Sequence, residues 1–413
     1  MIHFDRFILD NGLRVLFHQD VTTPLAVVNV LYDVGARDES EDQTGFAHLF
    51  EHLMFGGSVN IPEFDTPLQL AGGENNAFTS NDVTNYYDVL PVENIETALW
   101  LESDRMLSLA FTPKSLEVQR QVVIEEFKQR YLNQPYGNVW LELRPLAYQK
   151  HPYQWATIGK KIEHIEDATM EDVKAFFKKH YHPQNAILCI AGNLELNRVK
   201  ELTEKWFGGI PAGNKYERNL PVEPEQTEYR EKLIVSEVPT DAFYYAFKMV
   251  DRKHDDFYTA DALSDALGRD KSSRLYVRLK KEQKLVSEIN AYIMGSHDEG
   301  LLVISGKLYD DVSFETLEEA LWKELEHLCS EPIQSEELDK IMVKIRTAKA
   351  FQEHGLLNRA MALSMNELLG DANDINLEAE KYKRITPEDM HRVANDIFQK
   401  QRCSVLRIKA AKK

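Results

Sequence analysis

Strand-like alternation of apolar and polar residues opens the chain. Apolar-rich runs at residues 7–10 and 13–17 flank Asn11 and Gly12, a pair that accepts the positive φ angles of a two-residue hairpin turn. A further strand-like run follows at residues 25–32. Beyond it, segments of helical and strand-like periodicity mix without strict alternation. This pattern predicts an α+β fold in which antiparallel-rich sheets are covered by helices.

The second half of the chain repeats features of the first half, in the same order and at nearly the same separation. The matching segments are residues 96–100 with 318–322, residues 112–117 with 331–336, and residues 169–173 with 386–390. A polar, proline-containing stretch without periodicity lies between the halves. The sequence therefore predicts two homologous domains from an internal duplication. These are a first domain at residues 1–212, a linker at 213–230 and a second domain at 231–413.

Composition narrows the classes of function. The chain has 413 residues, of which 43% are hydrophobic and 28% charged, as is ordinary for a folded protein with more than one core. The formal net charge of −18 argues against nucleic acid as a partner, because phosphates require a basic face. No apolar run approaches the length that a membrane span needs. The N-terminal residues lack the apolar run of a signal peptide, so we expect a cytoplasmic protein, or a periplasmic one if a leader has been removed.

Residues 44–57 carry the strongest chemical signal in the chain. Their apolar positions fit a helix that ends at paired glycines. His48 and His52 are four residues apart, so both imidazoles leave one helix face and can reach a single zinc ion. Glu51 lies near the same face and, when ionised, can take a proton from water. The alternative is a helix with two surface histidines and a solvated glutamate, but the surrounding apolar residues make unsatisfied polar groups costly and favour the metal.

A catalytic zinc site typically has three protein ligands and one open position. We expect the third ligand in a second helix, which begins at Thr112. Val118, Val122 and Glu126 stack at four-residue intervals in that helix, so Glu126 continues an apolar stripe. Glu125 lies about 100° away around the helix. Because other apolar residues widen the stripe, the helical pattern favours Glu126 over Glu125 without excluding either.

Several motifs resemble those of the pitrilysin family of zinc metallopeptidases, which includes insulin-degrading enzyme and the mitochondrial processing peptidase. They lie at residues 48–52, 72–87, 122–126 and 273–279, and the resemblance extends over most of the chain. The inverted order of the zinc motif is characteristic of that family. The similarity is to the beta-subunit of the processing peptidase and to bacterial two-chain relatives. It implies duplicated α+β halves, with one zinc ion bound by the first half and no metal motif in the second.

The resemblance also implies roles for individual residues. It places the third zinc ligand at Glu126. It implies a substrate-binding edge strand at Asn76, Ala77 and Phe78, where the peptide backbone would add as a further strand. One departure lies at Gln119, because family members often have an acidic residue seven positions before the third ligand. Ligand orientation or metal affinity is therefore expected to differ here.

A second departure concerns the second half of the chain. Active family members usually carry an arginine and, seven residues later, a tyrosine that bind the substrate carbonyl and the tetrahedral intermediate. The corresponding residues here are Lys280 and Ser287, which provide neither an arginine fork nor a phenolic donor. Some family members divide the two functions between chains. The resemblance therefore implies a heterodimer in which a homologous partner chain supplies the arginine and the tyrosine, with a homodimer as the alternative.

Together these features predict a zinc-dependent endopeptidase that hydrolyses short or unfolded peptides inside a closed chamber. Glu51 would be the catalytic residue, and this chain would be the metal-bearing subunit of a two-chain enzyme. The alternative is a non-catalytic assembly subunit of the same fold. Such subunits usually lose their metal ligands, so the presence of His48, His52 and Glu126 favours the enzyme.

Overall fold

The computed structural model describes residues 1–411, which pack as two compact units. Unit 1 comprises Met1–Lys128, Trp155–Leu220 and Lys349–Leu377. Unit 2 comprises Gln129–Gln154, Pro221–Ala348 and the described chain from Glu378 onward. Each unit thus takes one segment from the other half of the sequence. The predicted domain bounds refer to sequence halves and not to packing units, so they stay a prediction. Residues 211–229, around the predicted linker, contain no helix or strand.

A six-stranded mixed sheet forms the centre of unit 1, in the order β1-β2-β6-β3-β5-β4. Its strands are β1 (Asp5–Ile8), β2 (Arg14–Gln19), β3 (Leu25–Tyr32), β4 (Glu74–Thr79), β5 (Thr84–Pro91) and β6 (Ala186–Gly192). β2 and β6 are parallel, and the other neighbours are antiparallel. β6 is buried along its whole length, as expected for an apolar run inside a sheet. β4 is an edge strand and therefore has only β5 as a neighbour within the described chain.

The opening hairpin forms where the sequence predicts it, but its turn is different. β1 and β2 are antiparallel, and Leu9 N–H donates to Leu13 O at 3.0 Å across the base of the loop. Only Gly12 in this loop has a positive φ, at 85°, whereas the predicted type of turn needs positive φ at both central residues. The Asn11 side chain instead donates to Phe207 O at 2.8 Å. The predicted two-residue turn is therefore wrong, and the loop is longer.

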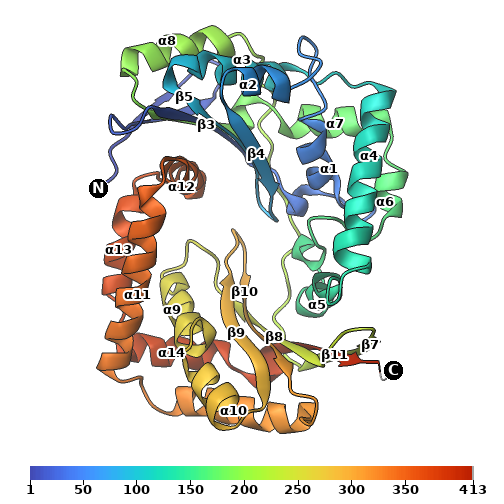
Figure 1. Ribbon diagram of the computed structural model, residues 1–413, viewed down its shortest axis with the longest axis vertical. Coiled ribbons are helices and arrows are strands. Elements are labelled where there is room, and N and C mark those ends of the chain that lie inside the picture. Colours follow the sequence, from blue (N-terminus) through green and yellow to red (C-terminus); the bar gives the residue numbers. More distant parts are fainter. Residues whose placement is uncertain (412–413) are drawn as a thin grey trace. The chain divides into compact units, whose positions relative to one another are not determined.

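Helices cover both faces of this sheet. α3 (Ile95–Leu107), with α8 (Leu196–Phe207) packed beside it, lies on one face, and α12 (Leu356–Leu369) covers the other (Figure 1). Buried hydrogen bonds join α12 to the sheet, because Asn85 donates to Asn29 at 2.9 Å and Asn29 donates to Ser364 at 3.0 Å. The other helices of unit 1 are α1 (Phe46–Leu53), α2 (Asp65–Leu70), α4 (Pro113–Phe127), α6 (Glu163–Glu166) and α7 (Met170–His180).

Unit 2 is built on a five-stranded sheet in the order β7-β11-β8-β10-β9. Its strands are β7 (Arg230–Ser236), β8 (Ala242–Met249), β9 (Val286–Met294), β10 (Gly300–Leu308) and β11 (Cys403–Ala410). β7 and β11 are parallel, and the other neighbours are antiparallel. One face carries a large apolar core beneath α9 (Phe257–Gly268), α10 (Phe314–Ser330) and α14 (Pro387–Ile397). α5 (Val139–Ala147) packs on the opposite face.

Among the described residues, three helices contain residues of both units, and several short helices complete the chain. The helices shared by the two units are α11 (Ser335–His354), α13 (Asp374–Lys383) and η3 (Lys128–Leu132). The 3₁₀ helices are η1 (Ala36–Asp38), η2 (Val92–Asn94), η4 (Pro152–Gln154), η5 (Pro183–Asn185) and η7 (Lys400–Arg402), and the π-helices are η3 (Lys128–Leu132) and η6 (Tyr276–Glu282). Among the described residues, none of the helices combines the length and apolarity required to cross a bilayer.

The two units have matching topologies, and the predicted α+β fold with duplicated halves is confirmed. From β2 onward, the strands of unit 1 follow the same spatial order and the same pattern of directions as the strands of unit 2. The matching sequence segments lie in α3 and α10, at the starts of α4 and α11, and at the starts of α7 and α14. Thr169 and Thr386 cap the last pair identically, by accepting from the N–H groups of Asp172 and Asp389.

Candidate metal centre

The helix that carries the two histidines starts at a position suited to glycine alone. Gly45, the N-cap of α1, has a φ of 87°, and a Cβ there would lie 2.7 Å from the carbonyl oxygen of Ile158. The apolar side of α1 is buried and consists of Phe46, Leu49, Phe50 and Leu53. His48 and His52 emerge on the remaining face, with 12% and 24% of their side chains exposed. Both imidazoles therefore leave one face, as their spacing predicts.

A buried carboxylate holds the first turn of α1. Glu39 accepts hydrogen bonds from the backbone N–H of Gly45 at 2.9 Å and of Ala47 at 2.8 Å. It thereby satisfies two donors at the positive end of the helix. Burial raises the pKa of Glu39 to about 8, although the same N–H donors oppose the shift. Glu39 is not among the residues predicted from the sequence; an acidic residue shortly before a helix start is the signal that could have indicated it.

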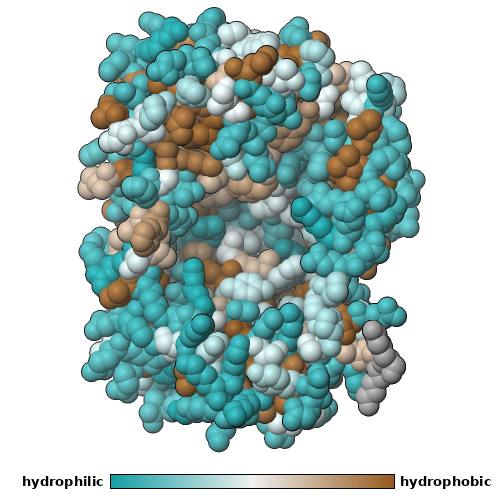
Figure 2. Space-filling view, viewed as in Figure 1, coloured by the Kyte–Doolittle hydropathy of each residue, from teal (hydrophilic) through white to brown (hydrophobic). Residues whose placement is uncertain are grey.

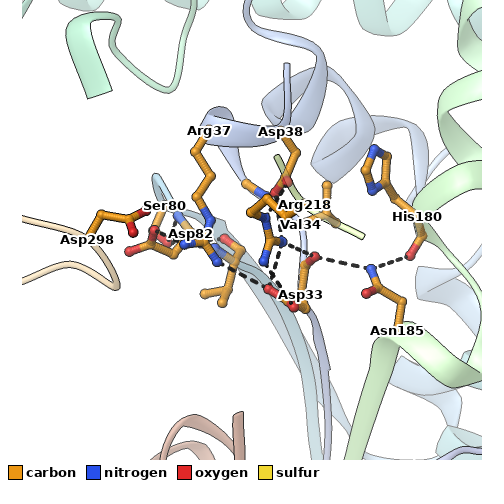
Figure 3. Close-up of polar contacts among 12 residues, drawn as sticks. Asp33, Val34, Arg37, Asp38, Ser80, Asp82, His180, Asn185, Arg218 and Asp298 are labelled. Carbon is orange, nitrogen blue, oxygen red and sulfur yellow. Dashed lines mark hydrogen bonds and ion pairs between the residues drawn. The ribbon is translucent and has the colours of Figure 1, made fainter. Parts of the chain in front are cut away.

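The loop before Glu39 is fixed by ion pairs, which Figure 3 shows. Arg218 contacts Asp33 through Nη2 at 2.9 Å and Asp38 through Nε at 2.7 Å. Burial raises the pKa of Asp38, while Arg218 opposes that shift. Ion pairs of this kind contribute geometry more reliably than stability. Because Asp38 precedes Glu39 in the chain, the network limits how far the capping carboxylate can move.

The second helix begins as predicted but buries a different face. Thr112 accepts from the N–H of Ser115 at 3.0 Å and caps α4. Val118 and Val122 are 49% and 44% exposed, and Figure 2 shows hydrophobic residues on the surface over α4. The buried residues are instead Leu116, Val123, Ile124 and Phe127. The stripe through Val118 and Val122 is therefore the wrong reason for choosing Glu126, because α4 packs against α1 and α6 through the other face.

Glu126 nevertheless meets the two histidines. Its Oε2 is 3.3 Å from His52 Nε2 and 3.6 Å from His48 Nε2, and the three ligand atoms all lie within 4.8 Å of one another. Ligand bonds of about 2.1 Å in tetrahedral geometry separate neighbouring ligand atoms by about 3.4 Å. The donor types and their spacing thus fit a zinc ion. Glu125 is 56% exposed and pairs with Lys128 at 2.8 Å, so it does not join the group.

Glu51 is hydrogen-bonded to the edge strand β4. Thr79 Oγ1 donates to Glu51 Oε2 at 2.5 Å. Burial raises the pKa of Glu51, whereas this bond and the neighbouring His52 oppose the shift. A carboxylate with a raised pKa is a better proton acceptor near neutral pH. Thr79 is not predicted from the sequence, because its contact with Glu51 joins residues that are distant in the chain.

The three predicted substrate-binding residues lie in β4. The exposure of its side chains alternates, with Asn76 and Phe78 on the more open face and Ala77 on the other. Phe78 is 38% exposed. The Asn76 side-chain oxygen accepts from the N–H of Ala77 at 2.8 Å. A free sheet edge of this kind can take a further strand.

The residues that depart from the family pattern make local contacts. Gln119 is half-buried on α4, two helical turns before Glu126 and therefore near the same face. Lys280 lies in η6 of unit 2, with its Nζ 5.1 Å from the centre of the Tyr276 ring. Ser287 is the second residue of β9, and its hydroxyl donates to the Lys307 carbonyl oxygen of β10 at 3.3 Å.

Comparisons with known proteins agree with one another. The model of the insulinase family, peptidase family M16, matches residues 14–160, and the model of the peptidase M16 inactive domain matches residues 167–343. The zinc protease PqqE of Helicobacter pylori is 30% identical over 399 residues, which are 95% of this chain and 89% of that protein. A probable mitochondrial-processing peptidase subunit beta of Schizosaccharomyces pombe is 28% identical over 266 residues, or 63% of this chain and 58% of that one.

A solved structure extends this similarity to the whole fold. The crystal structure of a protease from Helicobacter pylori covers 99% of this chain and 100% of its own, with a TM-score of 0.93 and 29% identity. His48, His52 and Glu126 all lie within the segment that matches the insulinase model. The predicted family is confirmed by these comparisons, and the chain belongs to peptidase family M16, the insulinase family.

Proposed function

We propose that this chain is a zinc-dependent endopeptidase that acts on short or unfolded peptides. The observation that carries the proposal is the convergence of His48, His52 and Glu126 beside Glu51. Three ligands with a nearby carboxylate that is not itself a ligand are the composition of a hydrolytic zinc site. The names of relatives such as the zinc protease PqqE support zinc as the metal.

The chemistry divides between the metal and Glu51. Zinc, when bound, supplies a Lewis acid that polarises the scissile carbonyl and lowers the pKa of water. Glu51 accepts a proton from the attacking water as the new C–O bond forms. It then donates this proton to the leaving amine nitrogen as the peptide C–N bond breaks.

The substrate is proposed to bind as an added strand along β4. Its backbone would pair with the free edge at Asn76, Ala77 and Phe78. The Ala77 N–H, which now donates to Asn76 Oδ1, becomes available when that side chain turns away. Only an extended segment can join a sheet edge, so this mode favours short or unfolded peptides. Enclosure of the substrate in a closed chamber stays a prediction.

A partner chain is part of the proposal. By sequence position, Lys280 and Ser287 correspond to the arginine and the tyrosine that the family resemblance leads us to expect, and neither replaces those donors. We therefore propose a heterodimer with a homologous chain that supplies them. A homodimer is the alternative, and a non-catalytic assembly subunit is the rival function.

One experiment tests these proposals together. Wild type and Glu51→Gln are assayed on a mixed library of quenched fluorescent peptides, with and without a homologous chain that carries the arginine and tyrosine, and zinc is measured on the same samples. We expect about one zinc per chain in both proteins. Replacing the base should lower kcat by about 10²- to 10⁴-fold. Cleavage only with the partner supports the heterodimer, whereas cleavage by the chain alone as a dimer supports the homodimer. If no zinc binds, the assembly-subunit function replaces the enzyme.

A further inference from the structure

The side chain of the proposed base is held by one threonine of the edge strand. Thr79 Oγ1 donates to Glu51 Oε2 at 2.5 Å, a short bond of the kind made to an ionised acceptor. The hydroxyl of this edge-strand residue therefore faces the Glu51 carboxylate directly.

The strand geometry explains why Thr79 reaches Glu51. Thr79 is the last residue of β4, and it lies on the less exposed face of the strand together with Asn75 and Ala77. α1 packs against β4. The edge strand proposed to bind the substrate backbone is thus the strand that donates to the base.

We propose that Thr79 is a positioning residue for Glu51 and links substrate binding along β4 to the orientation of the base. This inference rests on the proposed peptidase function. The threonine hydroxyl fixes one carboxylate oxygen, so the other oxygen stays directed toward the attacking water. Threonine suits this role because its branched Cβ restricts χ1 and holds the hydroxyl in place. A peptide that pairs with Ala77 and Phe78 orders β4 up to Thr79, and the base is thereby oriented when substrate binds.

Local folding does not explain the hydroxyl. The turn after β4 is closed without it, because Ser80 N–H donates to Val83 O at 2.8 Å and the Ser80 hydroxyl accepts from the N–H of Asp82 and Val83. Thr79 and Thr84 already pair through the backbone at the end of the β4–β5 ladder. Removing only the Thr79 hydroxyl therefore leaves the strand and its turn intact.

The test uses two substitutions in the full chain, assayed under the conditions in which wild type is active. Thr79→Val removes the hydroxyl and keeps the branched shape, whereas Thr79→Ser keeps the hydroxyl. We expect Thr79→Val to lower kcat by about 10- to 100-fold, the usual cost of losing a group that orients a site residue, and to change KM by less than about threefold. In Thr79→Ser, kcat should stay within about threefold of wild type, because serine retains the hydroxyl donor.

Two further measurements separate positioning from folding. Zinc affinity by chelator competition and binding of a fluorescent peptide to the metal-free chain should be the same in both variants and wild type. The carboxyl ¹³C signal of Glu51, assigned by its absence in Glu51→Gln, should move in Thr79→Val and return toward its wild-type position in Thr79→Ser. These measurements do not depend on catalysis.

Several outcomes would overturn the inference. They are an unchanged kcat in Thr79→Val, a failure of Thr79→Ser to restore it, a parallel loss of zinc or peptide binding, and an unchanged ¹³C signal in Thr79→Val. If wild type hydrolyses no peptide with or without a partner, the proposed function fails and the catalytic role of Thr79 fails with it. The ¹³C signal then separately decides whether the threonine holds the carboxylate.

Discussion

The two units share one topology, but the helices at equivalent places carry different chemistry. α1 follows β3 in unit 1, and α9 follows the equivalent strand β8 in unit 2. α1 presents His48 and His52 four residues apart. α9 presents Asp261 and Asp265 at the same spacing, and burial raises the pKa of both carboxyl groups. Each helix thus carries two titratable groups on one face. Of these two pairs, the histidine pair of α1 belongs to a candidate metal centre, and the aspartate pair of α9 does not.

The chemical difference between the two helices comes from the residues that contact each pair of side chains. Glu126 from α4 lies within 3.6 Å of both imidazoles and completes a set of three ligand atoms. In unit 2, the Tyr382 hydroxyl donates to Asp261 at 2.6 Å, and Arg269 pairs with Asp265 at 2.9 Å. The Tyr382 hydroxyl and the Arg269 guanidinium satisfy these carboxylates directly, so no metal ion is needed there. The duplicated scaffold determines where side chains emerge, and the neighbouring residues determine whether they form a metal centre or a structural contact.

The largest effect is expected from removing the residue that distinguishes the two arrangements. Glu126→Gln replaces the anionic ligand by an amide, so zinc content should fall from about one per chain to nearly zero, and peptide hydrolysis should be lost. Zinc is measured by atomic emission after dialysis against a weak chelator. Glu125→Gln is the matched control, because Glu125 is its neighbour on α4 and points elsewhere. If Glu125→Gln lost the zinc and Glu126→Gln kept it, the face that α4 presents to α1 would be wrong.

How much the sequence predicts depends on how local each feature is. The hairpin position, α1 between its glycines, and the start of α4 at Thr112 follow from short-range signals, and all three form. The repeat could be predicted because duplicated segments keep similar residues at helix starts, as Thr169 and Thr386 do.

The features that escaped prediction depend on tertiary contacts. α4 has apolar residues on two faces, and the sequence does not reveal that the face with Val118 and Val122 remains exposed. Thr79 contacts Glu51 only because β4 packs against α1. α5 comes from the first half of the sequence but packs in unit 2, and α12 comes from the second half but packs in unit 1. No local sequence pattern indicates this arrangement, since either helix would fit an apolar sheet face.

A smaller effect is expected at the start of α1. Glu39→Gln keeps the shape of the side chain, but its amide can accept from only one of the two N–H groups and turns a donor toward the other. One buried N–H left unsatisfied costs about 1–3 kcal/mol. We expect the amides of α1 to exchange hydrogen faster, by the factor that this loss of free energy implies. Zinc binding should also weaken, because the helix that carries both histidines becomes less stable. Glu41→Gln, two residues away and 69% exposed, is the control and should change stability by less than about 0.5 kcal/mol.

The pH dependence of the Glu39 variant sharpens this prediction. The pKa of Glu39 is raised from 4.5 to about 8 in the folded chain, so the folded state holds a proton that the unfolded state releases. Its contribution to stability is therefore complete below about pH 4.5 and is lost as pH rises through 8. Glu39→Gln removes this dependence of stability on pH. The difference in unfolding free energy between wild type and variant should therefore be largest at low pH and should be small above pH 8. A constant difference across this range would show that the Glu39 carboxyl does not titrate there.

The smallest effect is expected in unit 2, at the helix that corresponds to α1. Asp265→Asn removes a carboxyl whose pKa burial raises from 3.8 to about 6, so wild type should lose stability as pH rises through 6 and the variant should not. At pH 7.5 the variant loses an ion pair with a half-exposed arginine but no longer buries a charge, and the net change should be within about 1 kcal/mol. Hydrogen exchange of α9 at pH 4.5 and 7.5 measures this change, while zinc content and kcat should match wild type. A loss of zinc or of hydrolysis in this variant would mean that the acidic pair of α9 shares the function of the histidine pair of α1, and the contrast between the two units would no longer hold.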